Sequence, residues 1–482
     1  MNSETIAVRW NELVTREHLP KLVTLCLALW LHATNSMLAA TTMPSAVDDI
    51  GGLNLISWTF ALYLAGSISA AASISMIVGR IGLRKAMVRA ALVYTVGCVI
   101  VATAPMMEIL LIGRVFQGLG GGALMALVFV SQDRFFPNRL VPKVVALLSM
   151  VWMLAAFSGP AIGGAFATWG IWRMAFWSFA FQAVLLIPAI HFLMQGGERE
   201  SEDKLETIPF LRILFLCAAI LLFSLSAASF HPWGSPLMVM AGCFALGFFL
   251  MRDRKAAIGR IFPLEATRLG SPICSGIAMT LVLSLSIMSF IVYGPFLLIE
   301  LYGLTPLEAG FIVLIESLAW GSAAVIMSGL AANQEPRLIR VGNFMVVVGL
   351  IGMAMTLPND MLWPMVAAII TMNGGMGMMW GYIIKRIVGA VSAAEKDRAA
   401  SMLPITQQTG FALGAALSGV IANSLGVEAG GEETLQQVAF WIFAGFLPLV
   451  LLANWLAWRA ILMAGIQQTT QTHPTQIGRA HV

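Results

Sequence analysis

Apolar segments alternate with short polar segments along most of the chain. A helix needs about 20 predominantly apolar residues to cross a bilayer, and fourteen segments approach that length. The pattern therefore predicts an all-α membrane protein with 14 transmembrane helices. We expect these helices at residues 22–44, 55–78, 86–104, 106–130, 142–168, 172–194, 209–230, 236–251, 271–299, 305–330, 339–357, 363–386, 400–424 and 436–462.

Two charged stretches divide the expected helices into groups of six, two and six. Transporters built from internal repeats place their binding site near the bilayer midplane, between the repeats. We therefore expect two six-helix bundles and an inserted helix pair at their periphery. The predicted units are a cytoplasmic N-terminal segment (1–21), an N-terminal bundle (22–194), a cytoplasmic linker (195–208), the inserted hairpin (209–251), a second cytoplasmic linker (252–270), a C-terminal bundle (271–462) and a tail (463–482).

The last six residues, 477–482, resemble the translation of a common sequencing adapter. We expect them to be an artefact that carries no information about the fold. The last expected helix ends before them, so the helix count does not depend on this expectation.

The placement of positive charge supports the helix count. With a cytoplasmic N-terminus, 26 of the 28 Lys and Arg residues fall in cytoplasmic segments or at cytoplasmic helix ends. The two exceptions are Arg114, inside an apolar segment, and Arg173, in an outer loop. Because cytoplasmic loops of membrane proteins are enriched in Lys and Arg, we predict that both termini are cytoplasmic.

Composition excludes several classes of protein. The chain is 59% hydrophobic and only 11% charged, which no soluble domain matches. Its five cysteines lie in apolar segments without metal-ligand spacing, and no phosphate-binding loop, His-Glu-x-x-His motif or nucleophile elbow is present. We therefore expect no enzyme activity, no metal, no cofactor and no binding of nucleic acid.

Arg114 is the first candidate functional residue. A guanidinium inside a membrane helix costs at least ~2.5 kcal/mol and cannot escape by losing its proton. It must therefore face protein or a water-filled cavity. Gln117 lies one turn further on the same face, and the glycines at 118, 120, 121 and 122 allow neighbouring helices to approach closely. This combination indicates a solute pathway through the membrane.

Four motifs connect the chain to a known family. They are Arg114–Gly120 in the fourth expected helix, Gly159–Gly164 in the fifth, the loop Arg80–Lys85, and Thr406–Gly414 in the thirteenth; residues 58–63 and 169–173 also fit. On these motifs the chain resembles, over nearly its whole length, the fourteen-helix drug:proton antiporters of the major facilitator superfamily. The resemblance implies a major-facilitator-like fold that exports drugs in exchange for protons by alternating access.

Two of these motifs are expected to serve the conformational change. Gly159, Pro160, Gly163 and Gly164 place a kink and a close helix contact in the fifth helix, and the alternative is a structural kink without a role in transport. Arg80, Gly82, Arg84 and Lys85 resemble an inner latch between the two bundles, and the alternative is a topology signal alone. The family places an aspartate where Gly79 stands, so the latch would be loose or would use another acid such as Asp133.

The first expected helix departs from the family in a second way. Asn35 stands where the family has an aspartate, and an amide cannot carry a proton. His32 lies one turn away and is the helix's one group at that depth that titrates near neutral pH. It is therefore a candidate proton carrier. The alternative is a neutral histidine that shares a hydrogen bond with a backbone carbonyl or with Asn35.

Glu316 is the one acid near the middle of an expected helix. Desolvation favours the neutral form of a carboxyl group, so a buried acid of this kind can bind and release a proton near the working pH. The same group could bind a cationic substrate in competition with the proton. The alternative is a structural ion pair or a hydrogen-bonded acid.

Other polar and aromatic residues are candidates for lining a cavity between the bundles. Together with several methionines they would suit a broad apolar pocket with few fixed polar contacts. For each aromatic residue, packing in the core or at the membrane interface is the alternative. The candidates are Trp152, Tyr293, Trp320, Asn373, Trp380, Gln407 and Gln408.

These observations lead to one hypothesis and two rivals. The hypothesis is a proton-coupled exporter of small hydrophobic or cationic drug-like molecules in a bacterial inner membrane, acting as a monomer. Its partners are the substrate, protons and the lipid bilayer, with Glu316, Arg114, His32, Asn35 and Gln117 at the coupling site. The rivals are a transporter of the same fold for an endogenous metabolite, anionic if Arg114 is its counter-ion, and a membrane sensor that no longer transports.

Overall fold

A computed structural model describes residues 12–137, 140–194, 210–227, 234–256, 260, 262–268, 271–327, 334–391 and 396–455. This part of the chain contains the helices α1 to α14, some joined by short 3₁₀ turns, and no strand. The all-α fold class predicted from the sequence is therefore confirmed. The expected artefact at 477–482 lies outside the described residues.

The helices of the N-terminal half closely follow the predicted segments. Most bounds differ by a few residues, but α1 continues through Pro44, where we expected it to end. The helices are α1 (His18–Ile50), α2 (Ile56–Ile81), α3 (Leu83–Thr103), α4 (Met107–Phe135), α5 (Val141–Thr168) and α6 (Trp172–Leu193), with the turn η2 (Leu53–Leu55) between α1 and α2.

The remaining helices also occupy the predicted segments. The last differs most, because α14 stops at Ala444 and a turn at 445–446 leads into a further helical stretch at 447–455. The helices are α7 (Phe210–Ala227), α8 (Gly234–Lys255), α9 (Pro272–Tyr302), α10 (Pro306–Met327), α11 (Glu335–Thr356), α12 (Leu362–Ala390), α13 (Lys396–Ser424) and α14 (Glu432–Ala444).

Within the described residues, eleven helical stretches are long and apolar enough to cross a membrane. The helices outside that set are α7, α8 and α13. In the described part of α7 the apolar stretch is Leu211–Phe223, α8 ends in Arg252, Arg254 and Lys255, and α13 begins with charged residues and carries two glutamines.

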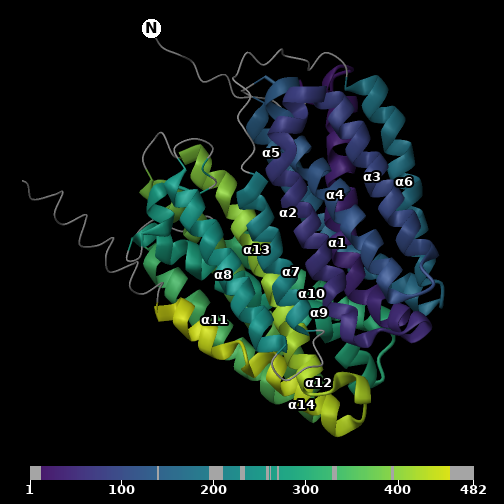
Figure 1. Cartoon of the computed structure of the whole chain (residues 1–482), viewed down its shortest axis with the longest axis vertical. Helices are drawn as coiled ribbons and strands as arrows, with labels where there is room; N and C mark the ends of the chain where they lie inside the picture. Colours follow the sequence, from purple (N-terminus) through teal and green to yellow (C-terminus); the bar gives the residue numbers. More distant parts are fainter. Residues whose placement is uncertain are drawn as a thin grey trace, which may run out of the picture.

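The helices form two groups that correspond to the two halves of the sequence (Figure 1). Helices α1 to α6 pack mainly on one another, as do α9 to α14. The two groups meet along α5 and α10 on one side and along α2 and α13 on the other. Helix α7 packs against both α2 and α13, and α8 packs against α7.

The same glycine spacing packs two helices in each half. On α5, a Cβ at Gly159 would lie 2.9 Å from the carbonyl oxygen of Thr34 on α1, and one at Gly163 would lie 2.8 Å from that of Leu38. On α13, Gly410 and Gly414 meet the backbone of α9 in the same way, at Leu281 and Leu285. Glycine is required at these positions because backbone lies where a side chain would go.

The two halves contact each other at the end of the molecule where α1 finishes, which we call the η2 end. There the amide of Leu307 at the start of α10 donates to the Thr168 hydroxyl at the end of α5 (3.0 Å). The Asn423 amide at the end of α13 donates to the carbonyl oxygen of Asn54 in η2 (2.8 Å). The charge pattern predicts that this end faces outwards.

The inserted helix α7 covers the boundary between α2 and α13. Leu216 and Ile220 of α7 form an apolar cluster with Ile68 of α2 and Ala412 of α13. The sulfur of Cys217 on α7 lies 2.7 Å from the hydroxyl oxygen of Ser69 on α2. Helix α7 therefore touches both halves of the molecule.

Candidate functional site

Arg114 is fully buried on α4 and is held by uncharged acceptors. Its Nε donates to the carbonyl oxygen of Thr59 on α2 (2.9 Å). Its Nη1 donates to Gln117 Oε1 (2.8 Å) and to Asn35 Oδ1 (3.3 Å). The ring of Tyr63 lies 4.4 Å from the guanidinium carbon. Dipoles and a π face therefore stabilise this charge, and no described carboxylate pairs with it.

Two hydrogen-bond donors in this cluster have no acceptor among the described residues. They are Arg114 Nη2 and Asn35 Nδ2, both buried among the described residues. Adjacent buried donors without acceptors are unfavourable, since buried polar groups are normally paired. They could donate to a solute that enters the cluster.

His32 is joined to this cluster through Tyr63, not through Asn35. The Tyr63 hydroxyl lies 2.9 Å from His32 Nδ1 and donates to the carbonyl oxygen of His32 (3.0 Å). The edge of Trp152 on α5 meets the imidazole, with ring centroids 6.0 Å apart. A Cβ at Gly121 would lie 2.9 Å from His32 Nδ1, so the missing side chain of Gly121 makes room for the imidazole.

Glu316 lies in the other half of the molecule, on α10. Its side chain is 4% exposed, and its Oε2 has no hydrogen-bond partner among the described residues. No ion pair of Glu316 is found in the described part of the chain, so the structure gives no sign of the structural ion pair that we considered.

Gln408 is the candidate that bridges the two halves. Its Oε1 on α13 accepts a hydrogen bond from the Ser67 hydroxyl on α2 (3.1 Å), and its Nε2 lies 3.8 Å from the sulfur of Met125 on α4. Its neighbour Gln407 is half-buried. A glutamine that reaches from one bundle into the other must change partners if the bundles separate.

The other cavity candidates lie in the C-terminal half. Trp320 on α10 and Trp380 on α12 meet edge to face, with ring centroids 5.7 Å apart. Asn373 on α12 is fully buried, and so is Tyr293 on α9, whose hydroxyl has no described partner.

The fifth-helix motif contacts both neighbouring helices at the η2 end. The carbonyl oxygen of Pro160 accepts a hydrogen bond from the Thr41 hydroxyl on α1 (3.2 Å). A Cβ at Gly310 on α10 would lie 2.7 Å from the same oxygen. Pro160 lies inside α5 and lacks an amide hydrogen. The motif therefore forms part of the contact between the two halves.

The basic loop between α2 and α3 is reduced to one residue, Gly82, which has a φ of +79°. Arg80 and Lys85 beside it are exposed, and Arg84 is half-buried. The side chain of Asp133, the alternative acid of the latch, lies outside the described side chains. The latch therefore stays a prediction.

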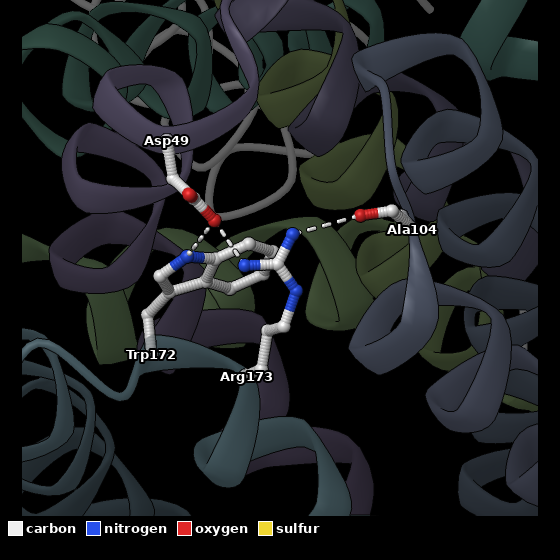
Figure 2. A network of polar contacts seen from close by, with 4 residues as sticks. All are labelled: Asp49, Ala104, Trp172 and Arg173. Atoms are coloured by element: carbon white, nitrogen blue, oxygen red, sulfur yellow. Dashed lines mark hydrogen bonds and ion pairs between the residues drawn. The ribbon is translucent and has the colours of Figure 1, made fainter.

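Arg173, the outer exception to the charge pattern, has a local partner (Figure 2). It pairs with Asp49 at the end of α1 and donates to the carbonyl oxygen of Ala104 after α3 (3.0 Å). Trp172 Nε1 donates to the same carboxylate (3.2 Å), and the guanidinium lies 4.4 Å from the Trp172 ring. The outer positive charge is thus compensated where it lies, and it ties together three helix ends.

Sequence reasoning missed Tyr63 and Thr59 as members of the Arg114 cluster. Tyr63 is one of only five tyrosines in the chain, and it places a polar hydroxyl group inside an apolar segment. Such a position indicates a buried polar contact and could have identified Tyr63 from the sequence. Thr59 contributes a backbone oxygen, for which the sequence holds no signal. The structure therefore assembles Arg114, Gln117, Asn35, Tyr63 and His32 in one half and leaves Glu316 in the other.

Comparison with known proteins identifies the class. The family model described as Major Facilitator Superfamily matches residues 25–385. The chain therefore belongs to the Major Facilitator Superfamily, and it is a multi-pass membrane transporter rather than an enzyme.

Named relatives and solved structures agree with this class. A probable multidrug-efflux transporter of Mycobacterium tuberculosis is 28% identical over 93% of this chain and 96% of its own. The multidrug efflux pump SdrM of Staphylococcus aureus is 21% identical over 83% of this chain and 88% of its own. The crystal structure of a D-xylose–proton symporter matches with a TM-score of 0.66 at 15% identity, covering 92% of this chain and 97% of that one. A peptide transporter structure also has a TM-score of 0.66, at 13% identity over 91% and 94%.

Proposed function

We propose that this chain is a proton-coupled exporter of small hydrophobic or cationic molecules in the inner membrane of a bacterium, with both termini cytoplasmic. Glu316 carries the proposal, because it is a buried acid with an unpaired oxygen inside a transporter helix. An acid that must load and unload a proton needs an environment in which neither form is locked by an ion pair.

The named relatives support the direction and substrate class of this proposal. Two are described as multidrug-efflux proteins and align along nearly the whole chain. The apolar and aromatic surroundings of the candidate residues suit lipophilic solutes, since few fixed polar contacts restrict what can bind. Contact between the halves at the η2 end would correspond to an outwardly closed state in an alternating-access cycle.

Purified protein in liposomes with an imposed pH gradient tests the proposal, with ethidium as the transported cation. We expect wild-type protein to move ethidium against the direction of proton flow and Glu316→Gln to lose gradient-driven movement. Glu308→Gln is the matched control, because Glu308 lies on the same helix but is exposed and caps the α10 N-terminus through Thr305. Wild-type liposomes that move no cation would count against the exporter function.

A second candidate function is transport of an anionic metabolite. It is favoured by the free donors of Arg114 and Asn35, which suit a carboxylate or phosphate oxygen. Loss of Arg114 would then abolish transport of an anion, whereas loss of Glu316 would abolish export of a cation. Screening a panel of organic anions with Arg114→Leu and Glu316→Gln distinguishes the two.

A further inference from the structure

Several buried side-chain oxygens in the described part of the C-terminal half have no hydrogen-bond partner, among them Oε2 of Glu316. Another is Oδ1 of Asn373 on α12, a residue with 0% exposure. The amide nitrogen of Asn373 donates to the carbonyl oxygen of Ile369 one turn before it (3.2 Å). The nitrogen is therefore in use, and the oxygen remains available only as an acceptor.

The register of α10 and α12 places Asn373 level with Glu316. A Cβ at Gly377 on α12 would overlap the backbone of Trp320 on α10. Further along, the Tyr382 hydroxyl of α12 donates to the carbonyl oxygen of Met327. The residue numbers of the contacting positions therefore increase in the same direction along both helices, so α10 and α12 run parallel. One turn back from Gly377 is Asn373, and one turn back from Trp320 is Glu316.

Helices α2 and α4 in the N-terminal half have the same register, and they show a contact one turn back from the glycine. There a Cβ at Gly118 on α4 would overlap the backbone of Tyr63 on α2. One turn back from that contact, the Arg114 side chain reaches across and donates to the backbone carbonyl oxygen of Thr59 (2.9 Å), so a side chain at this level reaches the facing helix. By the same register Asn373 corresponds to Arg114, and Glu316 corresponds to Thr59.

We propose that Asn373 Oδ1 accepts a hydrogen bond from the protonated carboxyl group of Glu316, so that the two residues form one proton-binding site. Two acceptor oxygens cannot bond to each other unless a hydrogen lies between them. A proton taken up from water forms the O–H bond on Glu316 and satisfies both unpaired oxygens. When the proton leaves, both lose their partner. Asn373 is then a positioning residue for the acid, which deepens the exporter function proposed above and rests on it.

Other ionisable groups do not account for the two oxygens. The helices that pack against α10 are α12, α5, α9 and α1. Towards the middle of these helices, the described groups are His32, which contacts Tyr63, and Tyr293. The remaining groups on these helices are His18, Lys21, Cys26, Asp48, Asp49, Cys274, Glu300, Tyr302, Tyr382 and Arg386, together with Lys143 and Lys385, whose side chains lie outside the described part.

Infrared titration of the purified protein in lipid nanodiscs, without substrate, tests the proposal. The carboxyl band that is present in wild-type protein and absent from Glu316→Gln reports the protonation of Glu316. Because the hydrogen bond exists only in the protonated form, Asn373→Leu should lower the midpoint of this band by about one pH unit. Asn343→Leu is the matched control, since Asn343 on α11 is equally buried and also bonds back to its own helix (3.1 Å). It should leave the midpoint unchanged.

Three results would overturn the proposal. The first is an unmoved midpoint in Asn373→Leu, and the second is a raised one, which desolvation by leucine alone would produce. The third is an equal shift in Asn343→Leu. If the leucine variant does not fold, Asn373→Ala removes the same acceptor with less bulk and carries the same expectation. The titration needs no transport, so a lowered midpoint in a protein that fails to export ethidium supports the hydrogen bond and contradicts only the exporter function.

Discussion

Gly310 determines how closely the two halves approach at the η2 end. A single methyl group at this position should therefore separate α5 from α10 there. A Cβ at 310 would lie 2.7 Å from the carbonyl oxygen of Pro160, and ordinary contact begins at 3.4 Å. The obstacle is helix backbone, which cannot rotate away. In Gly310→Ala the helices α5 and α10 must therefore separate by about 0.7 Å, the shortfall between those distances.

Overpacking of this kind costs about 1–3 kcal/mol. The cost falls on the state in which α5 and α10 touch, so its population should drop by about 5- to 150-fold relative to states in which they are apart. The expected result is a shift in conformation rather than general unfolding, because both bundles keep their internal packing.

Disulfide formation between Thr168→Cys and Leu307→Cys measures this population, since these residues meet across the two halves in the closed state. The cross-linking rate should fall when Gly310→Ala is added. Gly321→Ala on the same helix is the control, because a Cβ there meets nothing within 4 Å. A cross-linking rate in Gly310→Ala equal to that of the control would refute the reasoning.

Two further predictions test local contacts. Ser69→Cys should form a disulfide with native Cys217 under mild oxidation, because the Ser69 hydroxyl oxygen and the Cys217 sulfur lie 2.7 Å apart in wild-type protein. Ser73→Cys, one turn away, should not form it. Thiol labelling after oxidation measures the disulfide in both variants, and equal labelling of the two would show that α7 does not pack here. Asp49→Asn should lower the free energy of unfolding by less than about 1 kcal/mol, because the side chains of Asp49 and Arg173 are 48% and 35% exposed. Thermal unfolding followed by tryptophan fluorescence measures the change, and a much larger loss of stability would contradict the prediction.

The helices could be predicted because a membrane restricts the conformations that the backbone can adopt. Polar backbone groups in the bilayer must be satisfied within the segment, so apolar length alone indicates a helix. Helix ends are less constrained. Pro44 removes only one backbone donor, and α1 runs on to Ile50. The turn at 445–446 interrupts the last segment at Gly445, just before Pro448, which lacks the amide hydrogen that would bond to the carbonyl oxygen of Ala444; the sequence therefore carried a signal for this break that we did not use.

Charged residues at membrane depth could also be predicted, and so could Gln117 beside Arg114 on the same helix face, but the full set of contacts across helices could not. Arg114 and Glu316 stand out because ionisable residues are costly in apolar segments. The partners of Arg114 depend on how α4 sits against α1 and α2, which follows from glycine contacts between helices rather than from any local pattern. For the same reason the sequence placed His32 beside Asn35, whereas its contact is with Tyr63 on α2.

Substrate exchange and gradient-driven transport, compared in the same Glu316→Gln liposomes, test the central claim most directly. Exchange of labelled for unlabelled ethidium needs alternating access but no net proton movement. If Glu316 carries the coupled proton, the variant should keep exchange and lose uphill transport, while Glu308→Gln keeps both. Loss of both activities in a folded Glu316→Gln variant, or retention of both, would contradict the account.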